Sequence, residues 1–125
     1  MTGRKIDLVV RLWEDVIGGG ELHLLPSLAA DPYVRHTSRG TERLDRRQLE
    51  ESMLAYRSTL RHARVQVLQH TEDEHLVWSA LSVRGFDQQG GEVAVAFLSC
   101  HRVEAGRLAE AWILNAPGVD WAAAR

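Results

Sequence analysis

The spacing of apolar residues along the chain changes near residue 62. Before that point apolar residues recur every three or four positions, which is typical of one face of an amphipathic helix. After it they alternate with polar residues or form short continuous runs, which is typical of strands. The pattern therefore predicts an α+β domain in which three N-terminal helices pack on an antiparallel sheet.

Glycine, proline and the apolar spacing set the limits of the three predicted helices. The first runs from about residue 4 to the triple glycine at 18–20. The second covers 21–30 and ends before Pro32, because the residue that precedes a proline disfavours the α conformation. An extended segment at 33–37 and a loop at 38–40 follow, and the third helix runs from about 44 to 61. Their buried faces are expected to carry Ile6, Val9, Val10, Trp13, Val16 and Ile17, then Leu22, Leu25 and Leu28, and finally Leu49, Met53, Tyr56 and Leu60.

Four strands are expected at residues 64–71, 75–84, 92–104 and 107–116, separated by turn-rich segments at 72–74, 88–91 and 105–106. Such short connections predict an antiparallel meander. Both faces of the last hairpin are apolar, and helices on one side only would leave the second face in water. We therefore expect a bulky set in the helix-lined interior and a flatter set in a homodimer interface through the sheet. The inward set is Val93, Val95, Phe97, Val103, Leu108, Trp112 and Leu114, and the outward set is Ala94, Ala96, Leu98, Cys100, Ala109, Ala111 and Ile113.

A two-residue turn at 105–106 fixes the partners along this hairpin. If Glu104 pairs with Arg107, His101 stands opposite Glu110, and Ser99 and Phe97 share that face. Directly opposed Cβ atoms lie about 4.5 to 5.5 Å apart, so the imidazole and the carboxylate would share a proton as an acid/base pair. An ordinary cross-strand ion pair is the alternative, and a shift of one residue would move one partner to the other face.

The composition is that of one soluble globular domain, residues 1–125. Apolar residues make up 45% of the chain and the formal net charge is −2, with no polybasic block that would indicate nucleic acid or an anionic membrane surface. Arg11, Glu14 and Asp15 interrupt the N-terminal apolar stretch too early for a signal core, and no stretch approaches the length of a membrane span. A single cysteine, Cys100, excludes an intrachain disulfide, so we expect a cytoplasmic protein.

The histidines give no indication of a metal site. Four of the six, His23, His62, His70 and His75, lie at predicted turns and strand edges without the spacing of metal ligands. The sequence shows no nucleophile triad. Gly18–Gly20 is not a phosphate-binding loop, because it follows no predicted strand and precedes no lysine in register. We therefore expect no metal and no cofactor.

Three short motifs carry a family resemblance. Residues 28–36 read Leu-Ala-Ala-Asp-Pro-Tyr-Val-Arg-His, residues 106–108 read Gly-Arg-Leu at a turn, and residues 110–112 read Glu-Ala-Trp. With the order of elements, these motifs resemble the NTF2-like (cystatin-like cone) superfamily and, within it, the SnoaL-like polyketide cyclases. The resemblance implies a curved sheet around a long helix, an apolar pocket with a few polar groups, and a dimer.

The chain departs from the family pattern at one position that matters for chemistry. In the SnoaL-like cyclases an aspartate six residues after the motif glutamate is the acid/base, and that position is Ala116 here, with Asn115 before it. An amide cannot exchange a proton near neutral pH, although it can orient a carbonyl. Any catalysis is therefore expected to depend on His36, His101 and Glu110.

These residues give two hypotheses of function. The first is a cofactor-independent cyclase, isomerase or dehydratase that acts on a hydrophobic, carbonyl-bearing, polyketide-like molecule, with His101 as base, Glu110 as its partner and His36 at the mouth of the cone. The second is a dimeric module that binds a small ligand without chemistry. In both, the expected contacts to the ligand are Tyr33, Tyr56, Trp78, Phe97, Ser99, Trp112 and Asn115.

Overall fold

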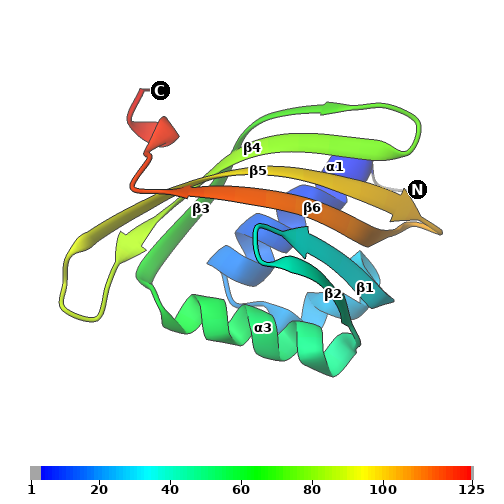
Figure 1. Cartoon of the computed structure of the whole chain (residues 1–125), viewed down its shortest axis with the longest axis horizontal. Helices are drawn as coiled ribbons and strands as arrows, with labels where there is room; N and C mark the ends of the chain where they lie inside the picture. Colours follow the sequence, from blue (N-terminus) through cyan, green and yellow to red (C-terminus); the bar gives the residue numbers. More distant parts are fainter. Residues whose placement is uncertain (1–3, 125) are drawn as a thin grey trace.

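The computed structural model describes residues 4–124, so residues 1–3 and 125 of the predicted domain lie outside the described part. One long curved sheet crosses the molecule, and the helices pack against one of its faces (Figure 1). The fold is α+β, as predicted, but the sheet has six strands rather than four. Their order is β2-β1-β6-β5-β4-β3, and all neighbours are antiparallel except β1 and β6.

The helices lie close to their predicted positions. The first is α1 (Lys5–Val10), which continues as the π-helical turns of η1 (Arg11–Gly18), and its buried stripe includes Ile6, Val9 and Trp13. The second is shorter than predicted, with η2 (Leu22–Leu24) and α2 (Leu25–Leu28), because Ala29 already belongs to a strand. The third, α3 (Arg46–Ser58), begins at Asp45, whose side chain accepts a hydrogen bond from the Gln48 backbone N–H at 2.8 Å.

The four predicted strands are β3 (Arg61–Glu72), β4 (Leu76–Phe86), β5 (Glu92–Glu104) and β6 (Arg107–Pro117). A short 3-10 turn, η3 (Trp121–Ala124), follows them. Two further strands form a hairpin on the free side of β6, namely β1 (Ala29–Thr37) and β2 (Gly40–Leu44). The polar sequence of β2 resembles a loop, since an edge strand needs little apolar surface. This hairpin matters because it forms one wall of the pocket described below.

The last hairpin has the predicted turn but not the predicted register. Ala105 and Gly106 both have positive φ angles, 51° and 77°, as a two-residue turn that follows the sheet twist requires, and Glu104 pairs with Arg107. In the next pair Val103 is opposite Leu108, but in the pair after that Arg102 is opposite Glu110 rather than Ala109. Ala109 is thus an extra residue on β6, a β-bulge, and every later pair is shifted by one position.

The bulge reverses which side chains of β6 face the helices. Ala111 is fully buried and Ile113 packs against the core, although both were predicted to face outward. Trp112 and Leu114 were predicted to face inward, but both are exposed on the outer face. The predicted division of the hairpin into an inward bulky set and an outward flat set is therefore wrong on β6, because a one-residue shift exchanges the two faces of a strand.

Within residues 4–124, no helix has both the length and the apolar character needed to cross a bilayer.

Candidate functional site

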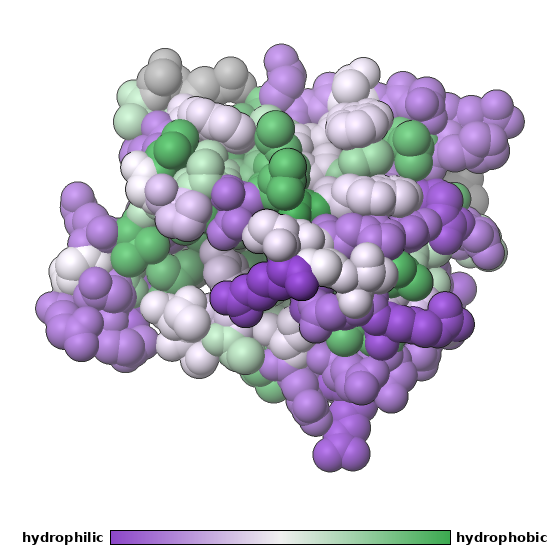
Figure 2. Space-filling view, in the orientation of Figure 1, coloured by the Kyte–Doolittle hydropathy of each residue, from purple (hydrophilic) through white to green (hydrophobic). Residues whose placement is uncertain are grey.

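A pocket of about 330 Å³ opens between the helices and the inner face of the sheet. That volume lies within the range of small-molecule sites. In Figure 2, apolar residues lie next to hydrophilic ones over the β1–β2 hairpin. The apolar lining is Leu12, Trp13, Ile17, Tyr33, Met53, Tyr56, Phe97 and Ile113. The polar lining is Arg35, Thr37, Ser38, Arg39, Glu42, Ser52 and Asn115. We call this site the inner pocket.

A tyrosine of the inner pocket is hydrogen-bonded to a buried histidine. The hydroxyl of Tyr33 on β1 lies 3.0 Å from Nε2 of His101 on β5, and His101 is 0% exposed. Burial lowers the pKa of His101 to about 4, because a charged imidazole is disfavoured away from water. Burial also raises the pKa of Tyr33, and the nearby Arg35 only partly offsets this rise. At neutral pH the pair is therefore a neutral imidazole beside a neutral phenol.

The mouth of the inner pocket is charged. Arg35 alternates with Tyr33 along β1 and faces the pocket with it, and its Nε and Nη2 donate to Oε1 of Glu42 on β2 at 3.3 and 2.8 Å. The side chain of Arg35 is 19% exposed and that of Glu42 is 52% exposed. Among the described residues that line this pocket, Glu42 is the one carboxylate.

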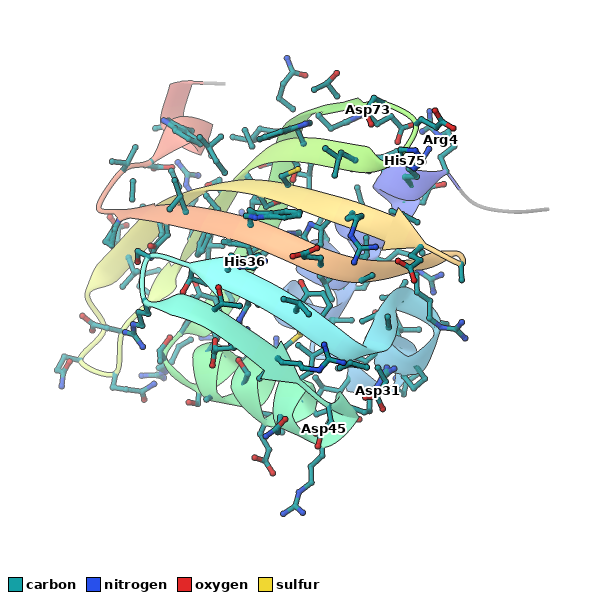
Figure 3. The ribbon with its side chains drawn as sticks, turned by 45° about the vertical axis from the view of Figure 1, so that its right-hand side comes forward. Arg4, Asp31, His36, Asp45, Asp73 and His75 are labelled. Atoms are coloured by element: carbon teal, nitrogen blue, oxygen red, sulfur yellow. The ribbon has the colours of Figure 1, made fainter. Side chains whose placement is uncertain are left out.

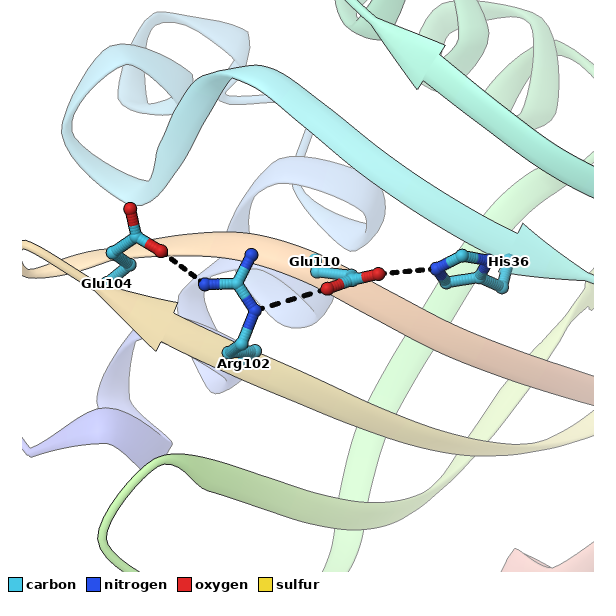
Figure 4. A network of polar contacts seen from close by, with 4 residues as sticks. All are labelled: His36, Arg102, Glu104 and Glu110. Atoms are coloured by element: carbon cyan, nitrogen blue, oxygen red, sulfur yellow. Dashed lines mark hydrogen bonds and ion pairs between the residues drawn. The ribbon is translucent and has the colours of Figure 1, made fainter.

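Glu110 lies on the opposite face of the sheet from His101, so their predicted pairing is wrong. Its two oxygens contact Nε2 of His36 at 2.6 Å and Nε of Arg102 at 3.1 Å, and Arg102 also pairs with Glu104 (Figure 4). The hydrogen bond from His36, with a smaller contribution from Arg102, lowers the pKa of the Glu110 carboxyl. Glu110 is therefore held as a carboxylate in an ion-pair network away from the inner pocket.

His36 completes this network at the outer face. Its Nδ1 lies 2.7 Å from the hydroxyl of Thr41, and its ring stacks on Trp112 with centroids 5.1 Å apart. Figure 3 marks His36 on β1, at the side where that strand runs along β6. A histidine with both nitrogens bonded and one ring face covered has a defined structural role here. Its predicted position at the mouth of the pocket is wrong, since strand alternation points it away from Arg35 and Tyr33.

The outer face also carries an apolar groove of about 520 Å³. Trp78 on β4 and Trp112 on β6 flank the buried Cys100 in one row of the sheet, and Leu98 and Leu114 are neighbours in the next row. Trp78 and Leu98 are each 53% exposed and Leu114 is 61% exposed. Exposed apolar patches of this kind are typical of surfaces that bind another molecule.

The predicted ligand contacts thus divide between two faces. Tyr33, Tyr56, Phe97 and Asn115 line the inner pocket, whereas Trp78 and Trp112 line the outer groove. Ser99 is buried, and its hydroxyl is 2.6 Å from that of Ser79, so it has a partner within the sheet.

The sequence analysis missed the charged residues at the mouth, Arg35, Arg39 and Glu42. The alternation of Tyr33, Arg35 and Thr37 within one strand is the signal that places Arg35 beside Tyr33. Glu42 needed the β1–β2 hairpin to be recognised, because only that pairing puts it opposite Arg35.

Among residues 4–124, no group of three or more histidine, cysteine, aspartate or glutamate side chains is arranged to hold a metal ion. The side chains that line the inner pocket offer phenol and aliphatic hydroxyls, an amide, a carboxylate and guanidinium groups.

The six-stranded sheet, wrapped on one side by helices and enclosing the inner pocket, is the NTF2-like fold of the SnoaL-like polyketide cyclase structures. Neither a family model nor a curated protein matches the chain. A candidate polyketide cyclase from Acidithiobacillus ferrooxidans superposes with a TM-score of 0.82 at 12% identity, over 92% of this chain and 89% of that one.

Two further structures show the same fold. IdmH of Streptomyces antibioticus, described as a candidate polyketide cyclase, has a TM-score of 0.78 at 19% identity, covering 90% of this chain and 92% of that one. A candidate SnoaL-like polyketide cyclase from Jannaschia has a TM-score of 0.79 at 14% identity, covering 89% of this chain and 84% of that one. At these identities the likeness establishes the fold, and function has to be inferred from the site.

Proposed function

We propose that this protein binds a hydrophobic, carbonyl-bearing small molecule in the inner pocket and rearranges it by acid/base chemistry without a cofactor. The observation that carries the proposal is the Tyr33–His101 pair, which combines a phenol lining an apolar pocket with a fully buried imidazole behind it. Polar groups fixed in a pocket of low dielectric stabilise developing charge more strongly than the same groups in water.

Tyr33 supplies the hydrogen bond to the substrate oxygen. When His101 carries its proton on Nε2, that N–H donates a hydrogen bond to the phenol oxygen of Tyr33. The O–H of Tyr33 is then free to donate to a carbonyl. The raised pKa of Tyr33 keeps that proton in place at neutral pH. His101 has a different role from the predicted base, because its pKa of about 4 makes it a poor proton acceptor. It positions Tyr33.

Glu42 is the carboxylate placed to take a proton. Loss of a C–H proton next to the carbonyl transfers that proton to Glu42 and leaves the electron pair in an enolate, whose oxygen accepts the hydrogen bond from Tyr33. Return of the proton to another carbon completes an isomerisation. Attack of the enolate carbon on a second carbonyl within the same molecule closes a ring, and the alkoxide formed from that carbonyl takes the proton back from Glu42. The contact with Arg35 keeps Glu42 at the pocket.

Exchange of α-protons tests this function without knowledge of the natural substrate. The probe is 2,6-diacetylnaphthalene in D₂O, and proton NMR measures the loss of its methyl signals. Wild type should accelerate the exchange, and Tyr33→Phe or Glu42→Gln should each reduce the acceleration by about a hundredfold. Glu51→Gln, a change of the same kind on the exposed face of α3, is the control. Exchange at the buffer rate with wild type, or at the full rate in both pocket variants, would refute the proposal.

A binding module without chemistry is the second candidate. The observation that favours it is the state of Glu42, which is half-exposed and already paired with Arg35. Saturable binding of the same probe in calorimetry, with no acceleration of exchange, would establish this candidate instead.

We also propose that a second copy of the chain covers the outer face. The patch of Trp78, Leu98, Trp112 and Leu114 is bordered by the network of His36, Glu110, Arg102 and Glu104, which carries both signs of charge. An apolar centre with a rim of both signs is self-complementary, as a twofold interface requires.

A further inference from the structure

The inner pocket has an apolar body and a mouth with an excess of positive charge. Two arginines, Arg35 and Arg39, line it together with one glutamate, Glu42. The whole chain has a formal net charge of −2, so this opening is opposite in sign to the molecule that surrounds it. A local reversal of sign at the entrance of a pocket attracts ligands of the complementary charge.

The two arginines are not equivalent. Arg35 is mostly covered and directs its Nε and one terminal nitrogen, Nη2, at a single oxygen of Glu42. Its other terminal nitrogen forms no hydrogen bond to residues 4–124. Arg39 lies on the turn between β1 and β2, where only its backbone N–H has a partner within the described chain, the Thr37 hydroxyl at 3.2 Å. Of the two arginines, Arg39 is therefore the one whose guanidinium has no counter-ion among residues 4–124.

The charge balance indicates the kind of anion. The excess is one positive charge, which a single carboxylate neutralises, whereas a phosphate monoester carries about −1.5 to −2 at neutral pH. Guanidinium groups match carboxylates in shape, since their N–H donors form two parallel hydrogen bonds. Ser52 and Asn115, which line the same pocket, offer further hydrogen bonds to a polar ligand group.

We propose that the inner pocket takes a ligand with a hydrophobic body and a carboxylate end, and that the carboxylate lies against Arg39 on the β1–β2 turn, beyond Glu42 as counted along the hairpin from Tyr33. This inference rests on the proposed function, because it assigns the far end of the same ligand. The carbonyl end lies between Tyr33 and Glu42, and the body packs against the apolar lining of Trp13, Phe97 and Met53. The ligand is thus a keto acid whose two oxygen functions are separated by an apolar frame.

An isosteric pair of probes tests the charge. 6-Acetyl-2-naphthoate has a ketone at one end and a carboxylate at the other, and 2,6-diacetylnaphthalene has ketones at both. Calorimetry on the full chain at low salt should show the acid binding at least about fivefold more tightly. Raising the salt from about 50 to 500 mM should reduce that preference, since the Debye length shortens.

A matched pair of variants locates the effect. Arg39→Gln should lower the preference for the acid by about threefold to fivefold, the effect of a solvent-exposed ion pair. Arg43→Gln removes the same charge from the adjoining strand, on a residue that strand alternation points away from Glu42, and should leave the preference unchanged.

The outcomes separate this inference from the proposed function. Equal binding of both probes, or a preference that Arg39→Gln leaves intact, would overturn the carboxylate assignment while the pocket itself stands. If neither probe binds, both the carboxylate assignment and the proposed function are overturned. Binding of both probes with the predicted preference, but without proton exchange, would support the carboxylate assignment and contradict catalysis.

Discussion

His101 is enclosed by the core, and this environment decides its charge. Burial lowers its pKa to about 4, compared with an ordinary value of about 6.5. The unfolded chain therefore binds more protons than the folded chain between these two pH values. Stability contributed by His101 is complete above about pH 6.5 and is lost as the pH falls toward about 4.

The lowered pKa of His101 predicts that the stability of the protein changes with pH. The free energy of unfolding in urea should fall between about pH 6.5 and 4 in wild type, by an amount on the order of a few kcal/mol. His101→Gln should show a smaller fall over the same range. Because that variant disturbs the core, an NMR titration of the histidine rings in wild type provides an independent measurement. A His101 ring that titrates near 6.5 would contradict the assignment.

Residue identity alone indicated several members of the site. Tyr33 and Asn115 were predicted as ligand contacts, and both line the inner pocket. The predicted pairing of His101 with Glu110 depended on the register between β5 and β6, and the extra residue Ala109 shifts that register by one position. Glu42 was missed, because its position at the pocket depends on β2, a strand too polar to be recognised from its sequence pattern.

At the scale of elements, the start of α3 has a defined chemical cause. Asp45 accepts a hydrogen bond from the Gln48 backbone, and the Gln48 side chain accepts one from the Asp45 backbone at 2.9 Å. This capping box satisfies two backbone donors that a helix N-terminus otherwise leaves free. The helix it begins carries Ser52, Met53 and Tyr56 to the inner pocket.

Removal of this cap should destabilise the protein. Asp45→Ala is expected to lower the free energy of unfolding by about 0.5 to 2 kcal/mol. Asp45→Asn retains an acceptor oxygen and should lose much less. Equal losses in the two variants would show that the hydrogen bond is not the cause.

The bulge at Ala109 sets the register between β5 and β6. Deleting Ala109 would remove the extra residue and leave both faces of β6 as they are, because Val103–Leu108 and Arg102–Glu110 then become consecutive pairs. We expect this deletion to retain cooperative thermal unfolding, as measured by circular dichroism. Deleting Ala111 instead turns either Glu110 or the stretch from Trp112 onward to the wrong face, and should abolish cooperative unfolding. Loss of cooperative unfolding in the Ala109 deletion, or its retention in the Ala111 deletion, would contradict this account of the register.

Periodicity predicted the helices, the four long strands and the last turn, because each depends on local spacing. The β1–β2 hairpin and the parallel pairing of β1 with β6 were not predicted. The β1–β6 pairing joins segments distant in sequence. The hairpin is local, but its short polar strand β2 has no alternation to reveal it. The bulge leaves no sequence signal in a run such as Leu108-Ala109-Glu110, where any residue could be the extra one.

At the scale of the whole molecule, the sheet separates two surfaces of different composition. One encloses the inner pocket against the helices, and the other carries the groove of Trp78 and Trp112. If a second copy covers the outer face, the inner pocket remains open in each subunit, since the two surfaces lie on opposite sides of one sheet.

Light scattering after size exclusion tests this arrangement. Wild type should elute as a dimer, and Leu114→Lys should be a monomer, because a charge at the centre of an apolar interface is not compensated. Leu114 is 61% exposed in the single chain, so the change should leave folding intact. Glu51→Lys, on α3, should remain dimeric. A monomeric wild type at about 100 μM would contradict the proposal.

The most direct test of the proposed chemistry compares the two faces of the sheet in one assay. Exchange of the methyl protons of 2,6-diacetylnaphthalene should fall by about a hundredfold in Tyr33→Phe and stay at the wild-type rate in Glu110→Gln, whose side chain lies on the outer face. Loss of exchange in Glu110→Gln with full activity in Tyr33→Phe would place the chemistry outside the inner pocket and contradict the account.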